Sequence, residues 1–290
     1  MRVLLLGATG SIGTAITREL VGRGHQVIGL ARSEASAQKI AALGGSPLPG
    51  DLRQPEAWAP VVKEVDAVVQ AAATFDQDMG ETDERAIEAI LDHAADRGSP
   101  LRLIYTGGCW LYGATGNRIA DETSPKRPIA SFAWMTEQSR TVLQAKGVSG
   151  AVIHPGMVYH EDGGGVFERY LTAARSDQPI EIWGSLNTRW PLVHRYDLAV
   201  AYRILLERPD LTGEFNACAQ SGVAASDIVA HIAQQTDHAG GYMVRTLKHV
   251  LCKYGAWAEG PTLDQQMCAE KLRRLCGWTP RYRCYSMATF

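Results

Sequence analysis

The chain opens with Met1-Arg-Val-Leu-Leu-Leu-Gly-Ala-Thr-Gly-Ser-Ile-Gly13, a short apolar segment that runs into glycines at positions 7, 10 and 13. The pattern predicts a buried strand, then an amphipathic helix, then a second strand over 26–30. In such a βαβ unit Gly7 permits the tight turn, Gly10 lets a pyrophosphate approach the backbone, and Gly13 lets the helix pack against the strand. The helix N-terminus points unpaired N–H groups and the positive end of its dipole at the anion. We therefore expect a dinucleotide-binding site.

The residues after the second predicted strand indicate which dinucleotide is bound. A site for NAD usually places an acidic residue there, which accepts hydrogen bonds from the ribose 2′-hydroxyl. Here the strand ends at Ala31 and is followed by Arg32 and Ser33. A guanidinium can hold a 2′-phosphate through charge-assisted hydrogen bonds, whereas a carboxylate would repel it. NADP(H) is therefore favoured over NAD.

Composition excludes several classes of partner. The net charge of −2 and the lack of a basic run argue against binding to nucleic acid or to an anionic membrane surface. The apolar strand at residues 2–6 leaves no room for a signal peptide, and no apolar stretch reaches membrane-spanning length. The six cysteines have no metal-like spacing, so we expect reduced thiols and no metal. A cytoplasmic protein with a small-molecule substrate is predicted.

Strands and helices alternate along the first half of the chain, as a parallel sheet requires. Strands are expected over 46–49, 65–70, 101–106 and 151–154, and helices over 36–43, 82–97 and 131–146. The predicted fold is an α/β doubly wound parallel sheet (Rossmann) with a smaller, mainly helical C-terminal substrate lobe. We assign residues 1–155 to the nucleotide-binding domain, to which 190–220 return, and 156–189 with 221–290 to the lobe.

The second half is less regular. We expect a flexible loop over 162–165, a short exposed strand over 179–183, a turn at Trp190-Pro191 and a strand over 192–194. Helices are expected over 197–207, 225–236, 247–257 and 263–275. Asp264 would lie at the start of the last helix, either as its cap or as a substrate contact.

Further segments, in order along the chain, resemble motifs of one enzyme superfamily. They are Asp51-Leu52, Ala71-Ala72-Ala73, Tyr105-Thr-Gly-Gly-Cys-Trp-Leu-Tyr-Gly113, His154-Pro-Gly-Met-Val-Tyr159, Val193-His-Arg-Tyr-Asp197-Leu-Ala and Leu275-Cys-Gly-Trp-x-Pro280. With the glycine loop, they make the chain resemble the extended short-chain dehydrogenases/reductases, which include the NAD-dependent epimerases and dehydratases. The resemblance covers nearly the whole chain.

The resemblance implies further cofactor contacts. Asp51 and Leu52 match the pair that contacts the adenine ring, and Ala71 to Ala73 match the small residues where the fourth strand ends. His194 matches a structural histidine. The predicted cofactor-binding residues are Gly7, Thr9, Gly10, Ser11, Ile12, Gly13, Arg32, Ser33, Asp51, Leu52, Ala71, Ala72, Ala73, Thr106 and Pro155.

The active-site pair of this superfamily is not matched. Its members use a tyrosine to transfer a proton and a lysine one helical turn later to lower the tyrosine pKa and hold the ribose. The resemblance places these positions on Phe132 and Thr136. Phenylalanine cannot transfer a proton and threonine supplies no cation. We therefore expect an atypical member with a degenerate active site.

Four other residues could contribute to catalysis. Thr106 ends the fifth strand, where ligands of open α/β sheets bind. Tyr112 follows it and could act as an acid or simply pack. Tyr159 and His160 follow the sixth strand and would lie at the mouth of the substrate cleft, where a histidine can act near neutral pH. An exposed loop histidine without a role is the alternative for His160.

Three functions remain open on the sequence. The first is an NADP(H)-dependent oxidoreductase or epimerase-like enzyme acting on a small carbonyl or alcohol. The second is a non-redox isomerase, lyase or cyclase on the same fold, and the third is a binding protein that senses NADP(H). Aromatic residues of the lobe, among them Trp183 and Trp257, favour a hydrophobic metabolite, whereas Arg169, Arg175, Arg189 and Arg195 are scattered candidates for an anionic group. The helices over 82–97 and 131–146 could form a homodimer seam.

Overall fold

The computed structural model describes residues 1–290, and contacts between residues divide the chain into two compact units. The first unit contains residues 1–107, 134–153 and 198–215, and the second contains 108–133, 154–197 and 216–290. The sequence-based division placed 108–133 in the nucleotide-binding domain, whereas the contacts group these residues with the second unit. The units are described separately below.

The first unit is built on a seven-stranded sheet with the order β11-β6-β5-β4-β1-β2-β3. Its strands are β1 (Arg2–Leu6), β2 (Gln26–Ala31), β3 (Ser46–Pro49), β4 (Ala67–Gln70), β5 (Leu101–Thr106), β6 (Val148–Pro155) and β11 (Gly213–Ala217). The pairs from β3 across to β6 are parallel. Strands β1 and β4 are apolar on both faces because helices cover both sides of the sheet. The predicted doubly wound α/β fold is confirmed.

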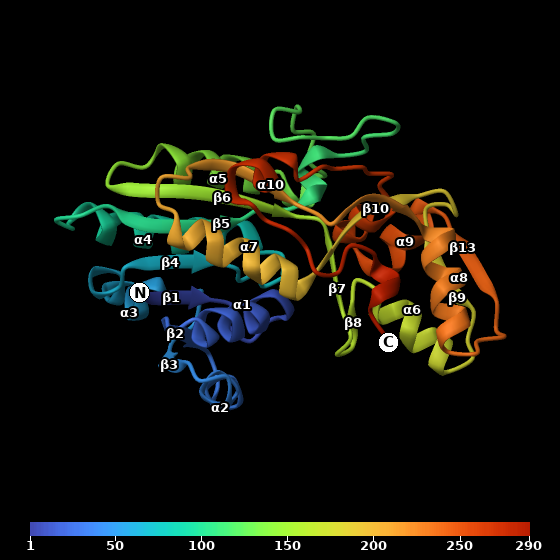
Figure 1. The fold of residues 1–290 in the computed structure, drawn as a ribbon, viewed down its shortest axis with the longest axis horizontal. Helices are drawn as coiled ribbons and strands as arrows, with labels where there is room; N and C mark the ends of the chain where they lie inside the picture. The colour runs from blue at the N-terminus through green and yellow to red at the C-terminus, as the bar shows by residue number, and fades with distance from the viewer. The chain divides into compact units, whose positions relative to one another are not determined.

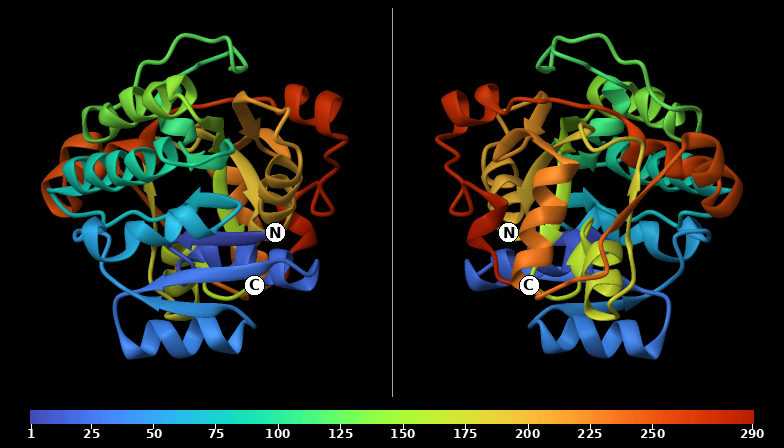
Figure 2. Two further views of the ribbon diagram at one scale, coloured as in Figure 1. Left: turned by 90° about the vertical axis from the view of Figure 1, so that its left-hand side faces the viewer. Right: turned by 90° about the vertical axis from the view of Figure 1, so that its right-hand side faces the viewer.

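Helices cover both faces of this sheet. They are α1 (Ser11–Gly22), α2 (Glu34–Ala42), α3 (Pro55–Trp58), the 3-10 helix η1 (Ala59–Glu64), α4 (Met79–Ala95), α5 (Trp134–Gln144) and α7 (Arg195–Glu207). Helices α1 and α7 lie on one face, and α4 and α5 lie on the other (Figures 1 and 2). Arg203 of α7 bonds Glu19 of α1 with an Nε to Oε1 distance of 2.7 Å. None of the helices of this chain has both the length and the apolar character needed to cross a bilayer.

The second unit contains two smaller sheets and several short helices. Its strands are β7 (Met157–His160), β8 (Gly164–Gly165), β9 (Ile180–Trp183), β10 (Arg189–His194), β12 (Gln220–Ala224) and β13 (Tyr242–Arg245). One sheet has the order β12-β10-β7-β8 and the other pairs β13 with β9. The helices are η2 (Cys109–Tyr112), η3 (Ala130–Phe132), α6 (Glu168–Arg175), α8 (Ala225–Gln235), α9 (Leu247–Tyr254), η4 (Ala256–Thr262), α10 (Glu270–Cys276) and η5 (Tyr285–Met287).

Several local predictions in the second unit are wrong. Trp190 and Pro191 lie inside β10 and not in a turn, and the pairing with β12 shifts register between Trp190 and Leu192. A register shift of this kind accommodates a proline, which cannot donate to the ladder. Strand β9 is buried and not exposed, because β13 pairs with it and α6 packs against it. Part of the loop predicted over 162–165 forms β8.

Candidate functional site

The glycine loop of the first unit packs tightly against the end of β4. Gly7 has a left-handed backbone, with φ of +82°, and a Cβ there would lie 2.6 Å from the carbonyl oxygen of Ala71. A Cβ on Gly13 would lie 2.0 Å from the carbonyl oxygen of Gly7. Both distances are shorter than any real contact, so only glycine fits. The close approach of another main-chain segment therefore requires glycine at both positions.

The end of α1 at this loop is left open. Gly10 is the N-cap residue, and no side chain caps the helix. A Cβ on Gly10 would lie 3.4 Å from its nearest neighbour, the carbonyl oxygen of Gly7, so the space above it is free. The Oγ1 atom of Thr14, one turn into α1, is buried and has no hydrogen-bond partner. Unpaired N–H groups at the helix N-terminus and free space above Gly10 suit a pyrophosphate, so the residues of the loop fit a dinucleotide.

Two cations lie at the ends of β2 and of the glycine loop. Arg32 directly follows β2 and is exposed. Lys39 of α2 donates from Nζ to the carbonyl oxygen of Thr9 over 2.6 Å, which brings its ammonium to the loop. The hydroxyl of Ser33 caps α2 by accepting from the Ser36 N–H. The sequence analysis selected Arg32 and Ser33 but missed Lys39, whose helical position gave no signal.

The turn after β3 has one partly exposed member, Asp51, and one buried member, Leu52. Asp51 accepts the Arg53 N–H at Oδ1 over 2.9 Å, and this hydrogen bond leaves its Oδ2 atom available to a ligand. The side chain of Leu52 packs in the hydrophobic core of the first unit, so only its backbone remains for a ligand. Arg53 binds Asp76 and Asp78 in the loop that follows β4. The turn is thereby tied to the segment after Ala71 to Ala73.

A buried polar network holds the end of β4. The side-chain oxygen of Gln70 accepts the Ala72 N–H over 3.0 Å, and its amide nitrogen donates to Asp83 over 2.6 Å. The Tyr105 hydroxyl donates to the other Asp83 oxygen over 2.8 Å. Burial raises the pKa of Asp83 to about 6, against the lowering effect of these hydrogen bonds. The sequence analysis missed this network, although a glutamine inside the apolar strand β4 was a possible signal.

Thr106 ends β5 and its hydroxyl is fully engaged. The oxygen lies 2.6 Å from the Gln70 carbonyl oxygen and 2.6 Å from the Tyr202 hydroxyl. A carbonyl oxygen can only accept, so Thr106 donates its one proton to Gln70 and accepts from Tyr202. Burial raises the pKa of Tyr202 well above its usual value, which keeps that phenol protonated. Thr106 therefore has no hydroxyl proton left for a substrate.

Tyr112 lies in the second unit and is buried. Its hydroxyl donates to the side-chain oxygen of Asn216 over 2.6 Å. The ammonium of Lys126 lies 3.9 Å from the centre of the Tyr112 ring. The Asn216 N–H in turn donates to Glu122 over 2.8 Å. These contacts position the phenol inside the second unit.

Tyr159 and His160 lie in β7, and the expectation of an exposed loop histidine is wrong. Residues 157–160 pair with β10 on one side and β8 on the other, which buries both side chains. The Tyr159 ring stacks on Phe167 with centroids 5.3 Å apart. Burial lowers the pKa of His160, and the charge of Arg195 lowers it further, so the imidazole is neutral near pH 7.

The two positions that the resemblance aligns with the tyrosine and lysine, Phe132 and Thr136, are grouped with different units. Phe132 is buried in the second unit and packs on Trp110 with centroids 5.2 Å apart. Thr136 lies in α5 of the first unit, and its hydroxyl has no hydrogen-bond partner. Pro155 ends β6 among residues grouped with the second unit.

Asp264 and His194, two polar residues selected from the sequence, have structural partners. Helix α10 begins at Glu270, so the predicted cap at Asp264 is wrong. The Asp264 carboxylate accepts hydrogen bonds from the main-chain N–H of Arg189 over 2.9 Å and from the Arg189 guanidinium over 2.7 Å. His194 is buried and its Nε2 lies 2.9 Å from Glu161, which agrees with a structural role. No group of three or more His, Cys, Asp or Glu side chains is placed to hold a metal ion.

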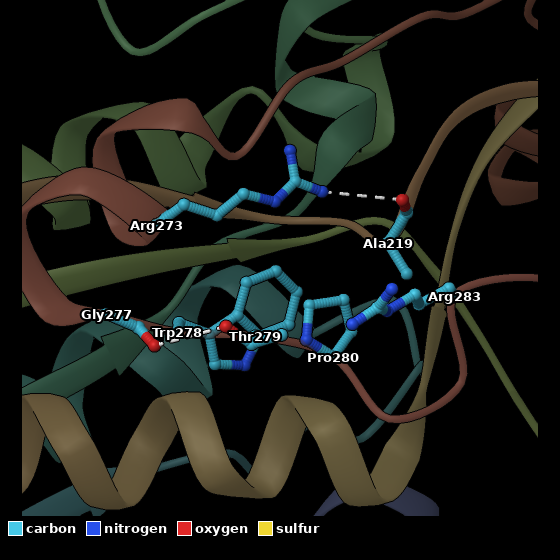
Figure 3. Close-up of a pocket in the computed structure, with 7 residues that line it drawn as sticks. All are labelled: Ala219, Arg273, Gly277, Trp278, Thr279, Pro280 and Arg283. Carbon is cyan, nitrogen blue, oxygen red and sulfur yellow. Dashed lines mark hydrogen bonds between the residues drawn. The ribbon is translucent and has the colours of Figure 1, made fainter.

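One cavity of about 320 Å³ lies in the second unit (Figure 3). It is lined by Ala219, Arg273, Gly277, Trp278, Thr279, Pro280 and Arg283. The Arg273 guanidinium donates to the carbonyl oxygens of Cys218 and Ala219 over 3.1 and 3.4 Å. The motif that ends at Pro280 contributes Gly277, Trp278 and Pro280 to the lining, but none of the predicted cofactor-binding or catalytic residues lines this cavity.

Comparison with known proteins gives one matching family and several relatives of similar sequence. The model of the NAD dependent epimerase/dehydratase family matches residues 3–218. An uncharacterised protein of Schizosaccharomyces pombe is 30% identical over 244 residues, 82% of this chain and 81% of that protein. An uncharacterised protein of Saccharomyces cerevisiae is 27% identical over 289 residues, 97% and 95% of the two chains. A Stigmatella aurantiaca ketoreductase of 4-hydroxy-2-methyl-3-oxo-4-farnesyl-3,4-dihydroquinoline-1-oxide is 29% identical over 188 residues, 61% and 56% of the two chains.

Solved structures share the fold along the whole chain. The Thermus thermophilus UDP-glucose 4-epimerase in complex with NAD has a TM-score of 0.80 at 20% identity, with 100% of this chain and 97% of that chain covered. A human epimerase family protein with NADPH has a TM-score of 0.81 at 20% identity, with 100% and 98% covered. Both NAD and NADPH thus occur among these neighbours. The family match and the shared fold confirm the predicted family: this chain belongs to the NAD-dependent epimerase/dehydratase family, within the extended short-chain dehydrogenases/reductases.

Proposed function

We propose that this protein is an NADP(H)-dependent oxidoreductase that acts on a small carbonyl or alcohol with an apolar body. The observation that carries the proposal is the glycine cradle, in which Gly7 and Gly13 are fixed by backbone approach while Gly10 and the first turn of α1 stay open. An open helix N-terminus of this kind suits a pyrophosphate.

The preference for NADP(H) is supported by the charges near the cradle. Arg32 is exposed after β2, and Lys39 reaches the carbonyl of Thr9. A 2′-phosphate would gain charge-assisted hydrogen bonds from both cations. NADPH, when bound, supplies a hydride for the carbonyl carbon, and the alkoxide that results needs a proton.

The source of this proton differs from the tyrosine that the superfamily uses. Phe132 has no exchangeable proton, and the Thr106 proton is held by the carbonyl of Gln70. We assign the proton to water. Without a positioned acid, the reaction loses about 10²–10⁴-fold in rate, which slows a reductase without preventing it.

The substrate class is supported by the second unit and by one relative. The Stigmatella aurantiaca protein reduces a ketone that carries a farnesyl chain, according to its name. The second unit of this chain groups Trp183, Tyr254 and Trp257, whose rings could contact a similarly apolar body.

Calorimetric titration and turnover together test the proposal. We expect NADPH to bind at least tenfold more tightly than NADH, and NADPH absorbance to fall when apolar ketones are added. If neither NADPH nor NADH bound the full chain, the proposal would be overturned.

A second candidate is a protein that binds NADP(H) without turnover. It is favoured by the engagement of Thr106 and by the phenylalanine at position 132. Tight NADPH binding with no turnover of any ketone or alcohol in the panel would select this candidate.

A further inference from the structure

The second unit contains an arginine whose hydrogen-bonding groups are unused. Arg169 lies at the start of α6 and is half-buried, and its Cζ lies 3.4 Å from the centre of the Trp183 ring. It makes no hydrogen bond or ion pair. Burial lowers its pKa, and an arginine guanidinium stays charged in proteins.

The other arginines selected from the sequence differ from Arg169. Arg189 is bound by Asp264, and Arg195 is bound by Asp162. Arg175 is exposed at the far end of α6. Only Arg169 therefore combines partial burial with an unoccupied guanidinium.

The nearby carboxylate is already neutralised by other groups. Glu181 of β9 accepts from Arg245 at Oε1 over 2.7 Å and from the Tyr254 hydroxyl at Oε2 over 3.0 Å. Lys253 lies 3.7 Å from the same carboxylate. Two cations and one phenol thus surround this carboxylate, and with Arg169 the region carries excess positive charge.

The two aromatic rings that contact the Arg169 guanidinium each carry a buried donor that is also unsatisfied. The Tyr170 hydroxyl and the Trp183 indole N–H have no hydrogen-bond partner. Buried polar groups are nearly always paired, so two unpaired donors next to an unpaired cation indicate a missing acceptor.

Stacking determines how such an acceptor would be recognised. The guanidinium carbon of Arg169 lies over the Trp183 ring, a contact that uses none of its N–H donors and leaves them for another partner. Carboxylates and phosphates match this planar fork with two parallel hydrogen bonds. Trp257, which is 37% exposed, lies next to Trp183 with ring centroids 5.9 Å apart and offers an apolar surface.

We infer that Arg169, stacked on Trp183, is a binding site for the carboxylate or phosphate group of a small apolar acid. That this acid is the substrate rests on the proposed function, but the binding site does not depend on it. The substrate would then be an acidic ketone or alcohol, with its charged end on Arg169 and its apolar part near Trp257.

The binding site is tested without any nicotinamide present. The indole N–H signal of Trp183, assigned by its loss in Trp183→Phe, is followed by NMR while inorganic phosphate or benzoate is added at constant ionic strength. We expect a saturable shift, weakened at least tenfold in Arg169→Gln and in Arg169→Lys, which keeps the charge but loses the fork. Arg175→Gln removes the same charge from α6 and should bind like the parent. The stronger of the two anions identifies the group.

The opposite results are equally clear. An unmoved Trp183 signal with both anions would overturn the site, and so would equal shifts in the parent and in folded Arg169→Gln. The spectrum itself reports folding, and Arg169→Lys provides the reading if the glutamine variant is unfolded.

The substrate assignment has its own arm. With NADPH, kcat/KM for a keto acid should fall at least tenfold in Arg169→Gln, while that for its methyl ester and the Kd for NADPH stay unchanged. An equal fall for acid and ester would overturn the assignment. Anion binding by a parent chain that binds no NADPH would instead reject the proposed function and retain the site.

Discussion

The hydroxyl oxygen of Thr106 lies 2.6 Å from the hydroxyl oxygen of Tyr202, at the carboxyl end of β5, where ligands of open α/β sheets bind. The Thr106 proton is directed at the main chain of Gln70, so the group joins two strand ends and a helix. Its position alone would suggest catalysis, but its hydrogen bonds indicate a structural role.

Thr106→Val should therefore lower the free energy of unfolding clearly while changing kcat little. The variant loses two hydrogen bonds and leaves the buried Tyr202 phenol unpaired, which costs about 1–3 kcal/mol in the free energy of unfolding. Urea unfolding measures this loss, and kcat with saturating substrate should fall less than about tenfold. Tyr202→Phe is the matched control, because it removes the bond from the other side. A fall in kcat of a hundredfold or more at unchanged stability would assign the proton to Thr106 instead.

Alanine at two glycines of the loop should have opposite effects. Gly13→Ala places a Cβ 2.0 Å from the Gly7 carbonyl oxygen and should destabilise the fold. Gly10→Ala meets only a 3.4 Å contact and should fold normally, while its methyl group obstructs the phosphate. Thermal unfolding and NADPH titration separate the two. Unchanged NADPH affinity in Gly10→Ala would show that the loop does not hold the pyrophosphate.

Arg32→Gln should convert a preference for NADP(H) into indifference. A hydrogen bond to a charged group contributes about 1.5–3 kcal/mol, so the Kd for NADPH should rise roughly 10–100-fold while that for NADH stays constant. Lys39→Gln should act in the same direction. Arg23→Gln, an exposed arginine beyond α1, is the charge control. If the Kd for NADPH and NADH rose in parallel, neither cation would be reading the 2′-phosphate.

Asp83 should make stability fall as the pH rises. Its folded pKa of about 6 exceeds the usual 3.8, so the folded chain holds a proton that the unfolded chain releases. The resulting stabilisation is complete below the unfolded pKa and is lost as the pH rises through about 6, a change of about 3 kcal/mol. Relative to Asp83→Asn, the parent chain should lose this amount in urea unfolding between about pH 4 and pH 7.

Asp96→Asn provides a control of opposite sign. Its hydrogen bond with Lys63 lowers the pKa of the Asp96 carboxyl, so its small contribution is lost as the pH falls. Identical pH profiles for the parent chain and Asp83→Asn would show that Asp83 titrates normally.

The sequence predicted the elements that depend on local pattern. Strand β5 has the predicted bounds of 101–106, and the glycine loop lies between a strand and a helix as expected. Apolar runs and glycine spacing are local signals that tertiary contacts here reinforce. The fold class followed from these signals, whereas the family was expected from the resemblance of several further motifs along the chain.

The remaining features depend on contacts between distant residues. Trp190-Pro191 is a turn-like dipeptide, but pairing with β12 draws it into a strand. Asp83 was not singled out in the predicted helix over 82–97, because its partners Gln70 and Tyr105 are 13 and 22 residues away in the sequence. Thr106 carried the right residue type in the right place, and only its partners revealed how its proton is used.

The side chain of Gln70 cannot turn over, because exchanging its amide oxygen and nitrogen would oppose Asp83 and the Ala72 N–H with the wrong groups. The segment after β4 is consequently ordered before any coenzyme arrives. The segment loses its conformational entropy when the chain folds. Binding of the coenzyme therefore does not include the cost of ordering this segment.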